Sequence, residues 1–471
     1  MHPPRHRCRL LPAAGLLALA AASAGCSHTP LGRAAHIATG FASHVLCDEV
    51  FISGLPLARA FDERIRPLPG QAAVVWALAA TDDPQRREVR VTLAGGFERR
   101  ARFTTRDGCQ VLLDGDAGPP PHEAPNQAPA VLPPDAFGPA PVPGSTGRLQ
   151  AALERALPQP ADAHRTRAVV VLQHGQLVGE RYAAGIGPDT PLLGFSASKA
   201  VTNALLGILV QQGRLRVDQP GVLPAWASPA DPRHAITAAH LLRHTAGLDL
   251  RQDNSGFDAS TQILFNQRDK AGAAAAAPLA HPPGQHWAYA DTNYLLLSRL
   301  VRDAVGGTAA SVQGFMQAAL FGPVGMRRAR MDLDATGTGM GAAQVTATAR
   351  DWARFGQLFL DDGLVAGQRL LPPGWVAWST TPTTTPGQAT GYGAGWWTNR
   401  QPGLVPGWGV PWGLPSAPAD TFFARGFMGQ FVVVVPSRRL VVVRLSSSHE
   451  RGDDIAETDR ILADILAAMA E

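Results

Sequence analysis

Valine-rich segments that lie far apart along the chain constrain the fold of this protein most strongly. AVVVLQ starts at residue 168, whereas FVVVV and LVVVRLS occupy residues 431–435 and 440–446. Runs of β-branched residues bounded by turn-forming residues predict buried strands. Because a mostly helical region separates these segments, we expect an antiparallel sheet assembled from distant parts of the chain. Helices would pack against this sheet and form an all-helical region beside it, which is an α+β fold.

Local sequence patterns predict further helices and two hairpins in the main domain. GRLQAALERAL, residues 147–157, has the apolar spacing of an amphipathic helix. His174-Gly175 predicts a hairpin turn after the first valine run, and residues 436–439 predict a second hairpin. DDIAETDRILADILAAMAE, starting at residue 453, predicts a final helix.

A proline-rich segment divides the chain. Ten prolines fall between Pro119 and Pro143. Proline fixes φ and lacks an amide hydrogen, so this segment predicts an extended linker or a wrapping arm. We therefore expect a small N-terminal domain at residues 35–114, a linker at 115–144 and a main domain at 145–471. Alternation broken at glycines in VRVTLAGGFERRARFTTRDGCQVLL predicts strands in the small domain.

The N-terminus predicts export. Three arginines precede an apolar stretch at residues 10–22, which is too short for a membrane span and fits a secretory signal over residues 1–25. ASA at residues 22–24 fits the cleavage site of a soluble secreted protein. SAGC, which ends at Cys26, resembles a bacterial lipobox and would make that cysteine the lipidated first residue. We favour the lipoprotein, anchored to a bacterial membrane in the periplasm.

Export also bears on the remaining cysteines. An exported chain folds in an oxidising compartment, so we predict a disulfide between Cys47 and Cys109, with two separate buried thiols as the alternative. The formal net charge of the chain is +4, and no basic block with interleaved aromatic residues occurs. Nucleic-acid binding is therefore not expected.

A single serine and lysine pair predicts the chemistry. The chain contains only two lysines, Lys199 and Lys270, among 42 basic residues. Arginine cannot deprotonate in a protein, whereas a buried lysine can. Ser196 lies one helical turn before Lys199, and the helix that follows ends at Gly213. The start of a helix stabilises developing negative charge, so the serine is a candidate nucleophile.

Longer segments carry a family resemblance. FSASKAVTNALLGILVQQGRLRVD resembles the S-x-x-K helix of the serine β-lactamase and penicillin-binding-protein superfamily. Residues 236–250 are similar to a segment of its class C-like branch, and residues 282–307 resemble the segment with its Tyr-x-Asn motif. Residues 345–363 and 418–445 also match. The pattern over residues 145–471 is most similar to the 6-aminohexanoate-dimer hydrolase type, and the cysteine-containing unit resembles that type's N-terminal extension.

The resemblance implies a role for each matching residue. Ser196 would be acylated, Lys199 would accept or relay its proton, and Tyr289 would help to protonate the leaving group. The third motif, usually Lys-Thr-Gly, aligns with residues 424–426, Ala-Arg-Gly. The backbone N–H of Phe427 would then join that of Ser196 in an oxyanion hole. The resemblance leaves open whether the lysine or the tyrosine is the general base.

Two departures from the family pattern matter. Asp291 stands where asparagine is usual, and an acid near Lys199 would hold the lysine charged, as an electrostatic partner of Tyr289. Alternatively, Asp291 points elsewhere and Asn293 is a surface residue. Ala424 replaces the lysine that holds the substrate carboxylate, which argues against efficient penicillin turnover.

The candidate substrate-binding residues are Asp291, Arg425, Gly426, Trp396 and Trp397. The arginine would bind an anionic substrate, or else lie solvated on its strand. The two tryptophans would form an apolar substrate wall, or else pack in the core.

Other chemistry is less well supported. His240 and His244 have the i, i+4 spacing of zinc helices, but the stretch lacks the glutamate of H-E-x-x-H. The segment at Ser196 lacks the last glycine of G-x-S-x-G, so a Ser-His-Asp triad is not expected. His449 is expected at the surface. We expect no metal and no organic cofactor.

These observations predict an exported serine hydrolase that cleaves an ester or amide bond of a small molecule through an acyl-enzyme on Ser196. A weak β-lactamase or D,D-peptidase that acts on cell-wall peptides is one alternative. A binding protein that has lost catalysis is another, kept open by Asp291. The oligomeric state cannot be inferred from the sequence.

Overall fold

The structure is a computed structural model. It describes residues 29–68, 74–116, 118, 147–157, 165–400, 403–406, 409–449 and 452–469. The predicted signal peptide with Cys26 and the proline-rich segment at Pro119–Pro143 lie outside these ranges. No helix in the described ranges is both long and apolar enough to cross a membrane.

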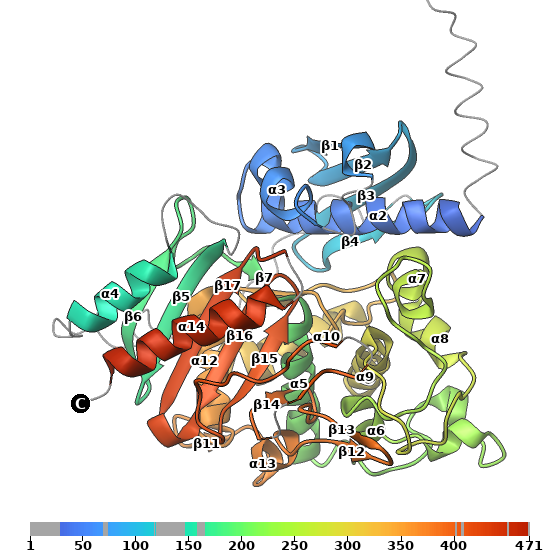
Figure 1. Cartoon of the computed structure of the whole chain (residues 1–471). Helices are drawn as coiled ribbons and strands as arrows, with labels where there is room; N and C mark the ends of the chain where they lie inside the picture. The colour runs from blue at the N-terminus through green and yellow to red at the C-terminus, as the bar shows by residue number, and fades with distance from the viewer. Residues whose placement is uncertain are drawn as a thin grey trace, which may run out of the picture.

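The main sheet of the described chain has six antiparallel strands in the order β14-β15-β16-β17-β5-β6 (Figure 1). In chain order they are β5 (Thr166–Gln173), β6 (Gln176–Tyr182), β14 (Trp397–Thr398), β15 (Phe422–Gly426), β16 (Gln430–Val435) and β17 (Leu440–Ser446). β17 pairs with β5, with Val442 opposite Val171. The expected antiparallel sheet assembled from distant segments is therefore confirmed.

Helices cover both faces of this sheet, as Figure 1 shows. α4 (Gly147–Ala156) and α14 (Asp453–Ala468) pack on one face, and α12 (Ala349–Leu360) packs on the other. Successive residues of β5 alternate between the two hydrophobic cores. A strand buried on both faces needs continuous apolar residues, which explains the valine runs.

Close packing of α12 depends on Gly356. A Cβ atom at this position would lie 2.6 Å from a methyl carbon of Val441 on β17. The glycine therefore lets the helix approach the strands more closely than a larger residue would.

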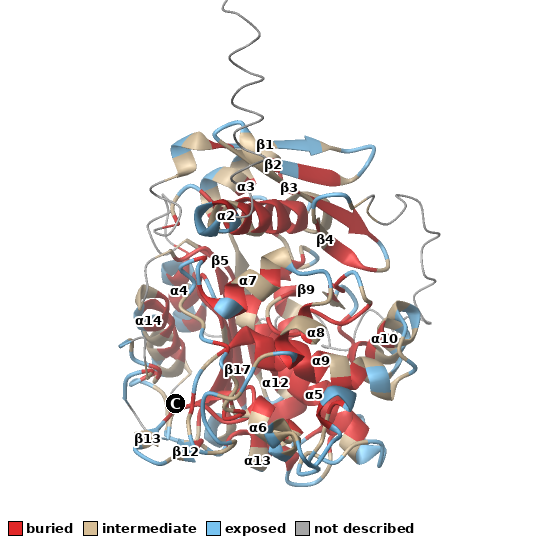
Figure 2. Cartoon of the chain, turned by 90° about the vertical axis from the view of Figure 1, so that its right-hand side faces the viewer, coloured by how far each residue is buried: buried red, intermediate tan, exposed pale blue. Residues whose placement is uncertain are grey.

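The central region is mostly helical. α5 (Ser198–Gln211) and α9 (Asp291–Ala304) are largely buried (Figure 2). Around them lie α6 (Ala238–Leu242), α7 (Ala259–Asn266), α8 (Lys270–Ala275), α10 (Ala309–Met316), α11 (Gly322–Val324) and α13 (Trp375–Ser379). Short strands form a small sheet and two hairpins: β7 (Leu192–Leu193), β8 (Arg330–Met331), β9 (Val345–Ala347), β10 (Leu364–Val365), β11 (Gln368–Arg369), β12 (Thr384–Thr385) and β13 (Gln388–Ala389).

The N-terminal unit consists of α2 (Pro30–Cys47), α3 (Leu57–Arg64) and a four-stranded antiparallel sheet. The strands are β1 (Leu78–Asp83), β2 (Glu88–Leu93), β3 (Gly96–Thr104) and β4 (Gly108–Leu112). The predicted disulfide joins Cys47 at the end of α2 to Cys109 on β4.

The long helix α2 was not expected from the sequence, and it begins five residues before the proposed domain start. Thr29 caps its first turn and Pro30 occupies the first helical position. This combination is a helix-start signal that sequence reasoning missed.

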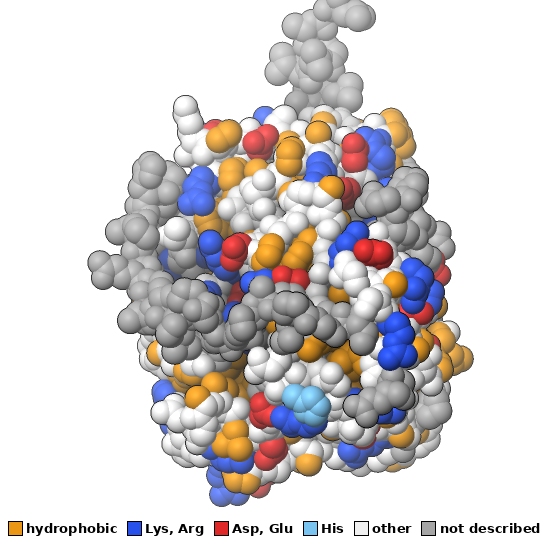
Figure 3. Space-filling view, turned by 90° about the vertical axis from the view of Figure 1, so that its left-hand side faces the viewer, with side chains coloured by type: hydrophobic (Ala, Val, Ile, Leu, Met, Phe, Trp, Pro, Cys, Tyr) orange, Lys and Arg blue, Asp and Glu red, His pale blue; other side chains and the backbone are white. Residues whose placement is uncertain are grey.

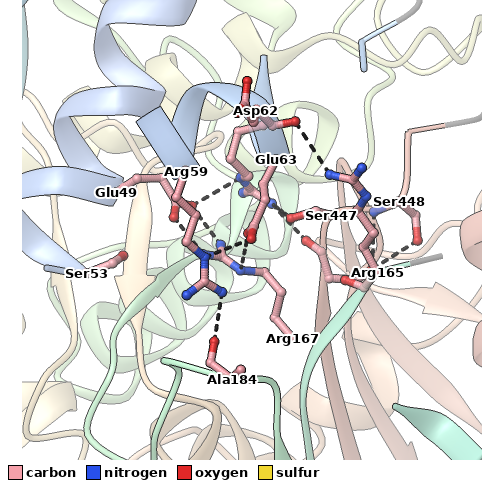
Figure 4. Close-up of polar contacts among 12 residues, drawn as sticks. Glu49, Ser53, Arg59, Asp62, Glu63, Arg165, Arg167, Ala184, Ser447 and Ser448 are labelled. Atoms are coloured by element: carbon pink, nitrogen blue, oxygen red, sulfur yellow. Dashed lines mark hydrogen bonds and ion pairs between the residues drawn. The ribbon is translucent and has the colours of Figure 1, made fainter. Parts of the chain in front are cut away.

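Buried ion pairs join the N-terminal unit to the main sheet. Glu49 accepts two hydrogen bonds from Arg167 of β5, at 2.8 and 2.7 Å, and lies 3.1 Å from Arg64 of α3. Arg64 also donates to the carbonyl oxygen of Ser446 at 2.8 Å. Figure 4 shows Glu49 and Arg167 reaching toward each other from the two units. Burial alone would raise the pKa of Glu49, but the two arginines outweigh it and lower the pKa.

Surface charge is mixed on the face that Figure 3 shows. Lysine and arginine side chains are interspersed there with aspartate and glutamate rather than gathered by sign.

Candidate active site

Ser196 lies in a sharp turn immediately before α5. The turn is the 3-10 helix η4 (Phe195–Ala197), and α5 begins at the next residue. Phe195 has φ +45°, a backbone conformation that side chains other than glycine seldom adopt. Phe195 and Ala197 are buried, whereas Ser196 is half-buried. The serine hydroxyl is therefore presented from a turn that packing holds on both sides.

Lys199 faces Ser196 from the first turn of α5. Its Nζ donates hydrogen bonds to Ser196 Oγ at 3.1 Å and to the carbonyl oxygen of Ala342 at 2.8 Å, and it forms a short ion pair with Asp291. The side chain is only 1% exposed. Burial lowers the pKa of Lys199, but the Asp291 carboxylate and Tyr289 raise it by more, so the net shift is upward. The lysine is therefore held in its charged form.

Tyr289 completes the predicted constellation. Its ring centroid lies 4.7 Å from the Nζ of Lys199. Burial raises the pKa of Tyr289, while the charge of Lys199 and hydrogen bonds with Lys199 and Ser196 oppose the rise. Asp291 raises that pKa further. The structure thus brings the serine, the lysine and the tyrosine together, with a neutral tyrosine in the resting site.

Asp291, the first residue of α9, is oriented by Gln252. One oxygen of its carboxylate contacts Lys199, and the other accepts a hydrogen bond from the Gln252 side chain at 3.0 Å. The Asp291 backbone N–H donates to the same glutamine at 2.6 Å. The alternative in which this carboxylate points elsewhere is therefore wrong. So is the surface position for Asn293, because its side chain is buried and lies 3.1 Å from Nδ1 of His244.

Sequence reasoning missed two residues of the site. Gln252 follows no spacing that would single it out. His244 was considered only as a metal ligand, whereas its ring packs 4.4 Å from the Tyr289 ring. Burial first, and then the charge of Lys199, lower its pKa well below the usual value. This histidine is therefore uncharged, and its ring packs against the ring of the tyrosine.

The end of β15 lies against the nucleophile turn. A Cβ atom on Gly426 would lie 2.0 Å from the carbonyl oxygen of Gly194, so only glycine allows this approach. Phe427 follows directly, and its ring lies 5.6 Å from that of Phe195. The predicted oxyanion hole, formed by the backbone N–H groups of Ser196 and Phe427, stays a prediction that this neighbourhood favours.

Arg425 lies on the opposite face of β15 from the nucleophile. Its guanidinium binds both carboxylate oxygens of Asp454 on α14, at 2.8 and 2.9 Å. Successive residues of a strand point to opposite faces, so Ala424 and Gly426 face α5 while Arg425 does not. The arrangement therefore does not support Arg425 as a ligand for an anionic substrate.

The two tryptophans, predicted together as a substrate wall, lie in different surroundings. Trp396 is fully buried and packs against Phe355 and Phe359 of α12, at 6.0 and 4.4 Å between ring centroids. It belongs to the core and not to a substrate wall. Trp397 stacks on Tyr289 at 6.4 Å and is 4% exposed. Its position suits holding the tyrosine ring more than contacting substrate.

The paired histidines do not share a helical face. The His240 side chain accepts the backbone N–H of Thr237 at the start of α6, and the helix ends at Leu242. His244 then adopts a positive φ of 58°. His449, expected at the surface, is half-buried, and its pKa falls to about 4 through burial and two nearby arginines.

One group within the described residues has the composition of a metal site. His44, Asp48 and Asp332 each offer a ligand atom, all within 4.8 Å of one another. However, the imidazole bridges the two carboxylates through different nitrogens, at 3.3 Å to Asp48 and 2.9 Å to Asp332. Burial lowers the pKa of His44, but the two aspartates outweigh it and raise the pKa. The three side chains therefore form a buried ion-pair cluster that links His44 of α2 to Asp332 of the main domain.

A serine one turn before a buried lysine, with a tyrosine beside both, defines a serine hydrolase of the S-x-x-K class. The beta-lactamase family model matches residues 152–467. The chain therefore belongs to the beta-lactamase family of serine hydrolases.

Among similar proteins is the 6-aminohexanoate-dimer hydrolase of Paenarthrobacter ureafaciens. The two are 27% identical over 233 residues, which cover 45% of this chain and 56% of the relative. The match thus spans little more than half of that relative's length. Two solved structures share the fold. A novel penicillin-binding protein homolog from Caulobacter crescentus has a TM-score of 0.53 and 19% identity, covering 70% of this chain and 99% of its own. A family VIII carboxylesterase has a TM-score of 0.55 and 15% identity, with the same coverages.

Proposed function

We propose that this protein hydrolyses an ester or amide bond of a small molecule through an acyl-enzyme on Ser196. The contact of 3.1 Å between Lys199 Nζ and Ser196 Oγ carries the proposal. The lysine donates in this contact, so the proton of the serine hydroxyl must point to another acceptor. Tyr289, which hydrogen-bonds to both side chains, supplies it. This favours the tyrosine as the proton carrier and the lysine as its fixed positive partner.

The reaction would then proceed in two balanced steps. In molecules whose Tyr289 has lost its proton, Ser196 Oγ attacks the carbonyl carbon while its proton moves to the Tyr289 oxygen, and Lys199 stays charged beside it. The same proton passes to the leaving alcohol or amine as its bond to the carbonyl carbon breaks. Water then attacks the acyl-enzyme, releases the acid and returns a proton to the serine. Backbone amides of Ser196 and Phe427 would stabilise the oxyanion in both steps.

The alternatives receive less support. A β-lactam or a D-alanyl peptide carries a carboxylate that needs a cationic partner. β15 has Ala424 at the position of the usual lysine, and the cation of this strand, Arg425, is bound to Asp454. A binding protein would not need a buried lysine aimed at a serine. The relative's name, 6-aminohexanoate-dimer hydrolase, suggests that amides of small linear molecules belong in the substrate screen.

The test is intact-mass analysis after reaction with a fluorophosphonate. We expect one adduct on the wild type and none on Ser196→Ala, because the reagent bonds only to an activated serine. Lys199→Arg should label at least about 100-fold more slowly, since the larger planar guanidinium cannot take the place of the compact buried ammonium between Ser196, Ala342 and Asp291. Folded wild-type protein that takes no label would contradict the proposal. Normal labelling of Lys199→Arg would show that the lysine is not specifically required.

We also propose that the protein is exported and anchored by a lipid on Cys26. The sequence of residues 1–25 and the Cys47–Cys109 disulfide support this, because disulfides persist in oxidising compartments. Mass spectrometry of the protein from membranes would show a lipidated N-terminal Cys26. A soluble product starting after residue 24 would contradict the anchor.

A further inference from the structure

The N-terminal unit extends to the catalytic turn. Its hydrophobic core, which includes Cys47 and Phe103, also contains Phe195 and Met428. These two residues directly flank Ser196 and Phe427, the two residues whose amides would form the oxyanion hole. The unit is therefore in contact with both sides of the proposed reaction centre.

A chain of aromatic rings continues outward from this core. The Phe427 ring lies 5.6 Å from Phe195 and 6.4 Å from Phe41 of α2, and Phe41 lies 6.0 Å from Phe265 of α7. All three contacts are edge-to-face. We call Phe41, Phe265 and Phe427 the aromatic wall. Phe427 is 50% exposed, and the other two are partly exposed.

Helix α2 also meets the loop that supports the catalytic carboxylate. Gln252 at the start of this loop binds Asp291, and Gly256 a few residues later lies against Ala34 of α2. Further along the helix, a Cβ on Gly40 would lie 3.5 Å from Phe265. Figure 1 shows α2 running across the top of the main domain above α7. The helix therefore borders the site from the Gln252 loop to the oxyanion residue.

The exposure of Phe427 needs an explanation. Phe427 does not stand alone, because its ring continues into those of Phe41 and Phe265, and a group of partly exposed aromatic rings beside a nucleophile is typical of a surface that binds an apolar ligand. The carbonyl oxygen of an acyl-enzyme on Ser196 would sit at the Phe427 amide, so the acyl chain would begin beside this residue.

We propose that the aromatic wall binds an apolar acyl group of the substrate, so that α2 of the N-terminal unit helps to select it. This inference rests on the proposed function, because it requires acylation of Ser196 with the oxyanion at Phe427. It specifies the substrate class as esters or amides of apolar acids, such as medium-chain fatty acyl groups.

The test compares p-nitrophenyl acetate, butyrate and octanoate, which share one leaving group. The measured quantity is the ratio of kcat/KM for octanoate to that for acetate. Phe41→Ala should lower this ratio about tenfold, since apolar contact near the acyl chain is lost. Phe41→Leu, which keeps an apolar side chain, should lower it less. Leu31→Ala is the matched control, because Leu31 is an exposed apolar residue of the same helix outside the wall.

Phe427→Ala provides a second variant in case Phe41→Ala folds poorly. It removes a half-exposed ring, keeps the backbone amide, and should lower the same ratio by a similar factor. Unchanged ratios in both folded variants, with a wild type that hydrolyses the esters, would overturn the wall and leave the proposed function intact. A wild type that hydrolyses none of the three and takes no fluorophosphonate would overturn both.

Discussion

A carboxylate at position 291 sets the charge state of the whole site. Asp291 binds Lys199 directly, and Gln252 holds it in place from the other side. It raises the pKa of Lys199 and also that of Tyr289. At neutral pH the site therefore rests with a charged lysine and a neutral tyrosine. Because only deprotonated Tyr289 can accept the serine proton, this resting state limits the fraction of the protein that is ready for acylation.

Replacing Asp291 by asparagine should shift the pH dependence of acylation to lower pH. The amide carries no charge, so the pKa of Tyr289 and that of Lys199 both fall. The deprotonated tyrosine would then form at a lower pH, and the rising limb of the profile would move with it. The measurement is the rate of fluorophosphonate labelling between pH 6 and pH 10.

Asp218→Asn, the same substitution at an exposed aspartate that pairs with Arg216, serves as the control and should leave the rising limb of the pH profile unchanged. If the limb of Asp291→Asn coincides with that of the wild type, the carboxylate does not set the pKa of the base. A shift to higher pH would contradict the sign of the effect.

At the scale of elements, the end of β15 and the nucleophile turn act as one unit. Gly426 lets the strand approach Gly194 so closely that no side chain fits between them. The strand then delivers Phe427 to the turn that carries Ser196. The predicted oxyanion hole would therefore depend on the distance between two backbones and not on any polar side chain.

Gly426→Ala should lower kcat/KM for p-nitrophenyl esters about 100-fold, because the new methyl group pushes the strand away and displaces one oxyanion donor. Steady-state kinetics and a melting temperature on the same sample measure this. Gly314→Ala on α10, where a Cβ atom meets nothing within 4 Å, is the matched control. Activity of Gly426→Ala within twofold of the wild type would refute this view of the strand.

At the scale of the whole molecule, the N-terminal unit and the main domain share buried charge. One carboxylate, Glu49, serves two buried guanidinium groups, Arg64 and Arg167, from different units. Its pKa is lowered, so its contribution to stability is present above the ordinary value of 4.5 and is lost as the pH falls through the lower folded value.

Glu49→Gln should lower the free energy of unfolding by about 3–5 kcal/mol at neutral pH, because it leaves two arginines buried without their counter-charge. Glu154→Gln is the control, since this exposed carboxylate pairs only weakly with Arg181 at the surface and its replacement should lower the free energy of unfolding by less than about 1 kcal/mol. Denaturant unfolding of the two variants provides the comparison. Equal stability of the two would show that the Glu49 cluster does not join the units.

Several features were predictable from the sequence because they depend on local pattern. Valine runs specify β5, β16 and β17. The three-residue spacing between Ser196 and Lys199 brings their side chains together once α5 forms. The disulfide was predictable because two cysteines remain after the predicted signal peptide and Cys26 are set aside. In each case the signal lies within a few residues or in a count of residue types.

Tertiary structure alone decided which neighbour each side chain meets. Nothing near Arg425 in the sequence predicts that Asp454 will bind it, or that Trp396 will enter the core while Trp397 supports Tyr289. The same is true of Phe41, which reaches the active site only because α2 packs across it. Periodicity fixes how side chains alternate along an element, but which layer covers each face depends on burying the most apolar surface across the whole chain.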